Sequence, residues 1–496
     1  MEVAFAKSQI SCLKTLKCEM QRREETQELR LPEEMPDIGR ILACWGQPVL
    51  RGKEWRKGSA HISGGIMVWV LYMPEDGGSA KQVETWIPFQ MKWEMPETDR
   101  DGIIHICPVL IGVDGRCISA RKMLVRCGIG VNMQAMLSQQ VMVSTAEECP
   151  EHIEILENTY PMRLPTEAGE KPFSVDIELS LLSGQPERII SYTLHPELQE
   201  HKMIGDKLVF RGVGRLHVVY SDQNGIVGSE DLEVPFSQYA ELEKEYPEEA
   251  LSQIDFAVTN LELQQNEAGQ LDLKAGLTGQ YTVYDCMMLK IVEDAYRPGW
   301  EIEKETFALQ LPALLDRHRE NISIQVLAEN VSDILDVVFY QEQAHPYWED
   351  GAWGAEPEGV FQVLYRDMEG QLQSMLIPWS GGWSLPAEKE TAVQSCWHKN
   401  GNIMCAPSMG GTMLQIESYV DVDTIQTQGL SMIAKLSVGQ PVKSHGERPS
   451  LILCKCQDES LWELAKKTGS TVKAICKANG LEEAPESGRI LLIPVS

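Results

Sequence analysis

Basic side chains are scarce in this chain. Its 496 residues include 44 Lys and Arg against 73 Asp and Glu, which gives a formal net charge of −29. Residues 449–496 carry six basic and six acidic side chains, so the first 448 residues hold the whole acidic excess. Because nucleic acids and anionic membranes both bind to basic surfaces, this balance argues against either as a partner. A basic protein partner is compatible with it, and so is a purely solubilising role for the acidic charge.

Long apolar runs are also missing. No stretch of about eighteen apolar residues occurs, so we expect no membrane-spanning helix. The opening segment Met1–Lys7 lacks the order of a basic region followed by an apolar one, and we therefore expect no secretion signal and a cytoplasmic location. The 13 cysteines include no Cys-x-x-Cys pair, which favours reduced thiols. Cys454 and Cys456 alone lack the four ligands of a structural zinc, so we expect no metal and no cofactor.

Catalytic signatures are equally scarce. The chain contains no P-loop, no GxGxxG, no GxSxG and no His-x-x-x-His motif. His105 lies near Cys107 in the sequence and Cys396 lies near His398, but neither pair is accompanied by a recognisable group that would orient the base. We therefore expect no catalytic residues and a non-enzymatic protein.

One sequence pattern occurs three times in the acidic part of the chain. An apolar run ends in a tyrosine, a glycine-containing turn follows, and a proline then precedes an aromatic residue. The three tyrosines are Tyr72, Tyr220 and Tyr365, and the proline–aromatic pairs are Pro88-Phe89, Pro235-Phe236 and Pro378-Trp379. Three diverged copies of one domain are the simplest explanation.

The residue types in these copies are those of β-strands. The runs are rich in β-branched and aromatic residues with partial alternation, and turns such as Asn224-Gly225 suit hairpins. Since proline cannot donate to a β-ladder, the strand that carries it should end there or lie at a sheet edge. We therefore predict a mainly β protein made of tandem small β-sandwich-like domains. The predicted bounds are 1–143, 160–285 and 300–438, with linkers at 144–172 and 439–449, the second flexible enough to let the tail reach a partner.

The tail, residues 449–496, shows a different order. Leu451–Cys456 is of strand length, Ser460 and Glu463 have capping-box spacing, and Asn479-Gly480 is a helix stop before a strand at Ile490–Ile493. The predicted order is therefore strand, helix, helix, strand. We expect Trp462, Leu464 and Ile475 to be core residues.

These tail residues resemble the LysM domain, through Ser460-Leu461-Trp462, Asn479-Gly480 and the strand before Pro494. In sugar-binding members of that family, the loop before the first helix contacts N-acetylglucosamine. Asp458 and Glu459 depart from the family residues in this loop. The resemblance implies a partner-binding surface made by two loops, with Asp458, Glu459, Ser460, Leu461, Asn479, Gly480 and Leu481 as its residues.

The three β copies before this tail resemble the SPOCS domain, through Leu31–Ile38, Leu71-Tyr72 and Ile87–Phe89. Three SPOCS copies followed by a LysM domain is the arrangement of SipL-like coat assembly proteins of endospore-forming clostridia. The resemblance implies a scaffold in the mother-cell cytoplasm that tethers the basal coat layer to the forespore surface, with the tail docked on a coat morphogenetic ATPase. The alternative is a protein of the spore cortex or cell wall whose LysM tail binds peptidoglycan.

Overall fold

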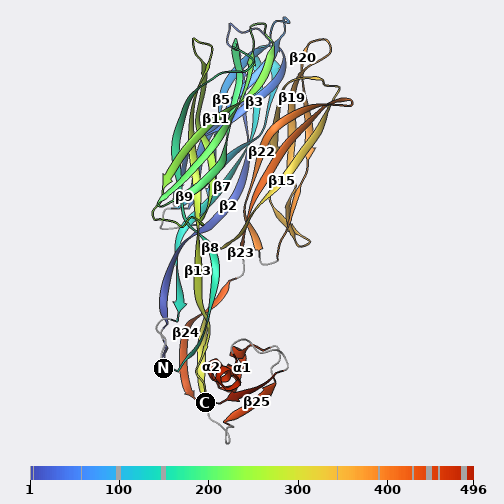
Figure 1. The fold of residues 1–496 in the computed structure, drawn as a ribbon. Coiled ribbons are helices and arrows are strands. Elements are labelled where there is room, and N and C mark those ends of the chain that lie inside the picture. The colour runs from blue at the N-terminus through green and yellow to red at the C-terminus, as the bar shows by residue number, and fades with distance from the viewer. Residues whose placement is uncertain are drawn as a thin grey trace.

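The computed structural model shows an almost entirely β protein with two short helices near its C-terminus (Figure 1), which confirms the predicted fold class. At one end of the molecule lie three units, each built from six strands in the same topology. A narrow β stalk leads from them to the helices at the other end. The structure describes residues 2–3, 5–56, 58–96, 102–146, 152–342, 344–388, 391–426, 429–442, 450–455, 459–481 and 489–495.

The first unit consists of two three-stranded antiparallel sheets, in the orders β3-β4-β5 and β2-β7-β6. Apolar side chains from both sheets, among them Ile66, Phe89 and Val125, share one buried cluster, so the pair forms a sandwich. Of the tryptophans crowded here, Trp45, Trp69 and Trp93 are buried, whereas Trp86 is partly exposed. The strands are β2 (Ala6–Arg30), β3 (Ile38–Arg56), β4 (Ser59–Pro74), β5 (Lys81–Glu94), β6 (Ile103–Ser119) and β7 (Lys122–Thr145).

The second unit repeats this topology, with sheets β9-β10-β11 and β8-β13-β12. Its core includes Phe210, Phe236 and Leu277. Trp45 and Trp69 of the first unit belong to the same apolar cluster, so the two units pack against each other. The strands are β8 (Glu154–Leu179), β9 (Arg188–Ile204), β10 (Lys207–Ser221), β11 (Val227–Glu241), β12 (Leu251–Gln265) and β13 (Leu271–Tyr296).

The third unit has sheets β16-β19-β20 and β15-β23-β22, and it carries an extra small sheet, β17-β18-β21. Phe361, Ile324 and Leu414 lie in its core. The strands of the unit are β15 (Leu314–Glu329), β16 (Asp333–Glu342), β19 (Glu358–Arg366), β20 (Leu372–Ser380), β22 (Thr391–Ser408) and β23 (Gly411–Gln426). Those of the extra sheet are β17 (Tyr347–Glu349), β18 (Ala352–Ala355) and β21 (Trp383–Pro386).

The stalk combines the far ends of β8 and β13 with a separate sheet, β1-β24-β14. Val292 and Ala295 of β13 pack with Ile433 and Leu436 of β24, which joins the two parts. Strands β14 and β24 fall within the predicted range 300–438 but belong to the stalk sheet and not to the third sandwich. The strands of this sheet are β1 (Glu2–Val3), β14 (Trp300–Leu309) and β24 (Leu430–Pro441).

The three repeated hairpins form as predicted. Tyr72, Tyr220 and Tyr365 lie near the ends of β4, β10 and β19, and the next strand returns alongside each of them. The proline-bearing strands β5, β11 and β20 continue past their prolines and are sheet-edge strands in all three units. An edge strand needs no ladder hydrogen bond on its outer side, so it tolerates proline.

The predicted linker at 144–172 is wrong over most of its length, because residues from Glu154 onward form β8. This strand pairs with β13 from Glu154 to Leu179. Arg163, Glu170, Asp176 and Glu178 are exposed, whereas Glu167 is buried and accepts from the Glu243 N–H and the Tyr246 hydroxyl. A strand with so many charged residues resembles a linker when no partner strand is visible.

Candidate functional site: the C-terminal module

The described part of the tail, residues 450–455, 459–481 and 489–495, forms a small unit that we call the C-terminal module. Its first helix, α1 (Leu461–Thr468), begins at a capping box. The Glu463 backbone N–H donates to the Ser460 hydroxyl at 3.2 Å, and the Ser460 N–H donates to the Glu463 carboxylate at 3.1 Å. Gly469 ends the helix with φ 71°, a left-handed conformation that favours glycine. The predicted start of this helix is confirmed.

The second helix, α2 (Val472–Asn479), is fixed at both ends. Its first turn is capped by Thr471, and Gly480 follows its last residue with φ 60°. The Asn479 amide donates to the Ile475 and Leu492 carbonyls and accepts from the Leu492 N–H, at 2.6 to 2.8 Å. Asn479 therefore ties the end of α2 to the last strand.

The two strands β25 (Leu451–Lys455) and β26 (Ile490–Pro494) pair antiparallel and complete the predicted order of strand, helix, helix, strand. Leu464, Ala465, Ile475, Leu491 and Ile493 are at most 3 % exposed and form the core. The core role predicted for Leu464 and Ile475 is confirmed. Trp462 is only half-buried, at the edge of this cluster.

The module is packed against the stalk through Tyr296, the last residue of β13. The Tyr296 ring lies 4.9 Å from the Trp462 ring in an edge-on arrangement, and its hydroxyl donates to the Ser470 carbonyl at 2.9 Å. Tyr296 is 5 % exposed and belongs to the apolar cluster of the module. The predicted linker residues 443–449 lie outside the described residues, but the module itself has a defined seat on the chain.

Asp294, two residues earlier on β13, provides the polar half of this contact. Its carboxylate accepts from the Trp462 indole N–H at 2.8 Å and from the Lys466 ammonium at 2.6 Å, and it also pairs with Lys304 of β14. Burial alone would raise the pKa of Asp294, but the bonds from Lys304, Lys466 and Trp462 outweigh it and lower the pKa to about 2. Asp294 is therefore ionised at neutral pH and holds α1 against the stalk.

The predicted partner-binding residues occupy different environments. Glu459 and Ser460 are exposed, and Glu459 pairs with Lys467 at 3.2 Å. Leu461 and Leu481 are half-buried and pack on the module core. Gly480 is exposed beside Asn479, whereas Asp458 lies outside the described residues. The partner-binding role of these residues stays a prediction.

The sheet of the module carries a second surface, which the prediction did not include. Leu451, Leu453 and Ile490 are 51 %, 72 % and 65 % exposed. Because Leu453 pairs with Leu492 and Lys455 pairs with Ile490, these side chains lie on one side of the two strands. We call Leu451, Leu453, Ile490 and Leu492 the outer face. Leu451–Cys454 is apolar at every position, so the sequence alone does not show which side of this strand is exposed.

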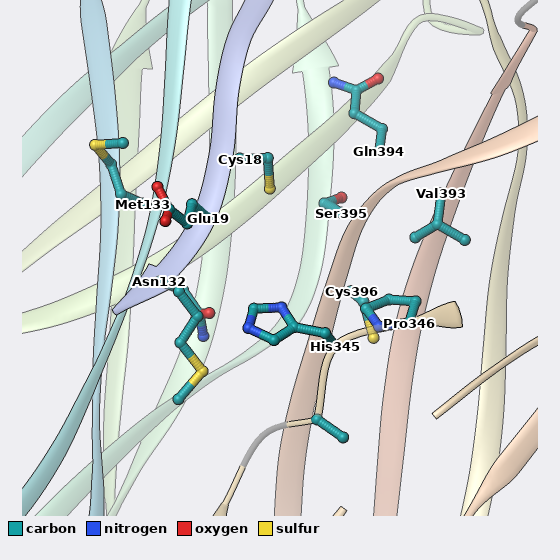
Figure 2. A pocket seen from close by; sticks show the side chains of 12 residues that line it. Cys18, Glu19, Asn132, Met133, His345, Pro346, Val393, Gln394, Ser395 and Cys396 are labelled. Carbon is teal, nitrogen blue, oxygen red and sulfur yellow. The ribbon is translucent and has the colours of Figure 1, made fainter. Parts of the chain in front are cut away.

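A small cavity between the first and third units holds the thiol of Cys396 (Figure 2). Cys18 and His345 also line this space of about 110 Å³. Burial raises the pKa of Cys18 to about 11 and that of Cys396 to about 12. Both are thus protonated thiols at neutral pH, and a thiol is a much weaker nucleophile than a thiolate.

The remaining candidates for catalysis or metal binding are the His105–Cys107 pair and the tail cysteines. Burial lowers the pKa of His105 to about 4 and raises that of Cys107 to about 12, so each is neutral at pH 7. Among the residues that the structure describes, no group of three or more His, Cys, Asp or Glu side chains could hold a metal ion. Cys454 packs on the module core, and Cys456 lies outside the described residues.

No helix in the described ranges is long and apolar enough to cross a membrane.

Comparison with protein families gives one match, to the model described as SipL, SPOCS domain. Residues 185–266 match the SPOCS domain. The match covers the sheet β9-β10-β11, the hairpin with Tyr220 and Pro235, and all of β12 in the second unit. The match shows that the second unit is similar to a SPOCS domain, and a SPOCS domain supports a role related to the spore coat. No curated protein and no solved structure matches the chain.

Proposed function

We propose that this protein is a non-enzymatic scaffold of endospore coat assembly, located in the mother-cell cytoplasm at the forespore surface. In this proposal, the C-terminal module docks on a protein partner, and the three β units bridge that partner to further coat components. The SPOCS match of residues 185–266 supports the coat-related part of the proposal.

The observation that carries the docking role is the position of the outer face. The module is seated at the far end of the stalk from the three sandwiches (Figure 1), and its outer face leaves three large apolar side chains more than half exposed. Exposed apolar side chains that gather on one side of a sheet are typical of protein-binding surfaces. Lys455 is opposite Ile490 at the edge of this face, so an apolar partner surface with an acidic neighbour would fit it. The resemblance of the tail implies a coat morphogenetic ATPase as that partner.

The second candidate is peptidoglycan binding. It is favoured by the strand-helix-helix-strand order, which places the loop before α1 and the residues after α2 as the LysM resemblance expects. In this candidate the loops at Glu459–Leu461 and Asn479–Leu481 would hold N-acetylglucosamine, and the outer face would have no part.

A pull-down from sporulating cells, run beside pelleting with purified cortex peptidoglycan, separates the two candidates. The full chain should retain a coat protein and stay in solution with peptidoglycan. Leu453→Glu should lose the coat protein, whereas the matched control Leu182→Glu, which changes a 94 % exposed leucine of the second unit, should keep it. Pelleting of the full chain with peptidoglycan, together with unaltered pull-downs for Leu453→Glu, would instead support the glycan candidate.

A further inference from the structure

A cavity of about 530 Å³ lies where the three β units meet. The first unit contributes Trp45 and Leu110 to its wall. The second contributes His195, Arg215 and His217, and the third contributes Asp336, Gln341, His398 and Lys399. A volume of this size is within the usual range for small-molecule sites.

The sheet register of the second unit gathers three basic side chains on this wall. His195 of β9 is directly opposite Arg215 of β10 in the antiparallel pair. Side chains at opposed positions share one face and have Cβ atoms about 5 Å apart. His217 is two residues beyond Arg215 and therefore lies on the same face.

The carboxylates around the cavity are already engaged by protein groups. His217 bridges Asp231 and Asp336, with each nitrogen–oxygen distance 2.7 Å, and Asp336 also accepts from the Trp45 indole. Burial would lower the pKa of His217, but these two carboxylates outweigh it and raise the pKa to about 10. Arg215 pairs with Glu197, and Lys399 pairs with Asp255 at 2.9 Å.

Several donors around the cavity have no acceptor among the residues that the structure describes. His195 lines the cavity, and its side chain keeps exposed surface there. No described group forms a hydrogen bond with this side chain. Burial, together with the nearby Arg215 and His217, outweighs the opposite effect of Asp231 and lowers the pKa of His195 to about 4, so its ring is neutral at pH 7. In the described part of the chain, Arg215 Nε and Gln341 Nε2 have no partner, while the terminal nitrogens of Arg215 bond to Glu197, Asn400 and Asn402.

His398 adds one more such donor. The Trp383 indole donates to His398 Nε2 at 3.1 Å, and burial lowers the pKa of this histidine to about 4. A neutral imidazole whose Nε2 accepts must carry its proton on Nδ1. That Nδ1 has no partner among the described residues.

We propose that this cavity binds a small oxyanion, a carboxylate or a phosphate group, between His195 and Arg215. Because the carboxylates around the cavity are already paired, hydrogen-bond donors of His195, Arg215, Gln341 and His398 are left without acceptors. The oxygen atoms of a carboxylate or phosphate group would supply those acceptors. A ligand there would touch walls contributed by all three units, so its binding would stabilise their packed arrangement. Such a site would make the scaffold responsive to a small molecule, which the proposed docking function does not include.

The test uses the full chain, with inorganic phosphate and citrate as separate probes in calorimetric titrations and thermal melts. We expect at least one probe to bind and to raise the melting temperature. His195→Ala and Arg215→Gln should weaken that binding by about tenfold or more, the usual cost of losing a hydrogen bond to a charged group. His201→Ala is the matched control, because His201 is on the same strand but does not line the cavity, and it should bind like the parent chain.

Binding of phosphate alone would assign the site to phosphate-bearing ligands, and binding of citrate alone to carboxylates. If Arg215→Gln fails to fold, His195→Ala decides, since its side chain forms no hydrogen bond within the described structure. The absence of binding by both probes, or equal affinity in the parent chain and His195→Ala, would overturn the proposal.

Discussion

Replacing Tyr296 by alanine should release the C-terminal module from the stalk while both parts stay folded. The side chain is 5 % exposed, its ring packs edge-on against Trp462, and its hydroxyl donates to the Ser470 carbonyl. Truncating a buried aromatic residue costs about 3 to 5 kcal/mol. Part of that cost destabilises the end of β13 itself. We therefore expect the contact between the module and the stalk to be weakened by about 2 to 3 kcal/mol. A loss of this size shifts the equilibrium between seated and released module by roughly 30- to 150-fold.

A graded pair of variants tests this estimate. Tyr296→Phe keeps the ring and loses only the hydroxyl bond, which should cost about 1 kcal/mol. In Tyr296→Ala, hydrogen exchange of the amides in α1 and at the end of β13 should become faster, and small-angle scattering should show a larger particle. Both changes should be small in Tyr296→Phe. Tyr239→Ala, which changes a 43 % exposed ring on β11, is the control and should match the parent chain. Unchanged exchange and scattering in Tyr296→Ala would refute the seat described above.

Three further predictions concern the same module. The folded-state pKa of Asp294 is depressed to about 2, so its contribution to seating is present above its ordinary pKa of 3.8 and is lost as the pH falls through about 2. Scattering should show release of the module as the pH falls through this window, and no such pH-dependent release in Asp294→Asn. Ile493→Ala removes a fully buried side chain and should destabilise the module by about 2 to 5 kcal/mol in a circular-dichroism melt, whereas Glu459→Lys should melt like the parent chain. Gly480→Ala places a Cβ at φ 60° and should lower the melting stability by about 1 kcal/mol; an unchanged melt would mean that this cap does not limit the stability of α2.

The local features of the fold were predictable because they depend on neighbours in the sequence. The capping box at Ser460, the glycine stop at Gly480 and the hairpin at Asn224-Gly225 each need only a few adjacent residues. The edge position of the proline-bearing strands followed from the missing N–H of proline. The repeated tyrosine hairpin indicated the three units, although it did not show which strands close each second sheet.

The long-range features could not be predicted in this way. Strand β8 was mistaken for a linker, because a strand with so many charged residues is recognisable only beside β13. The seat of the module joins Trp462 to Asp294 and Tyr296, about 170 residues earlier, and no sequence pattern indicates that pairing. The cavity between the units likewise depends on how three separate sandwiches pack.

The most direct test of the docking role compares the binding of one protein preparation to the partner and to peptidoglycan. The full chain, the chain lacking residues 449–496 and the Leu453→Glu variant would each be incubated with purified coat morphogenetic ATPase and, separately, with cortex peptidoglycan. We expect the full chain to bind the ATPase, both altered chains to lose this binding, and none of the three to pellet with peptidoglycan. Retention of ATPase binding after removal of residues 449–496, or binding of the full chain to peptidoglycan alone, would contradict it.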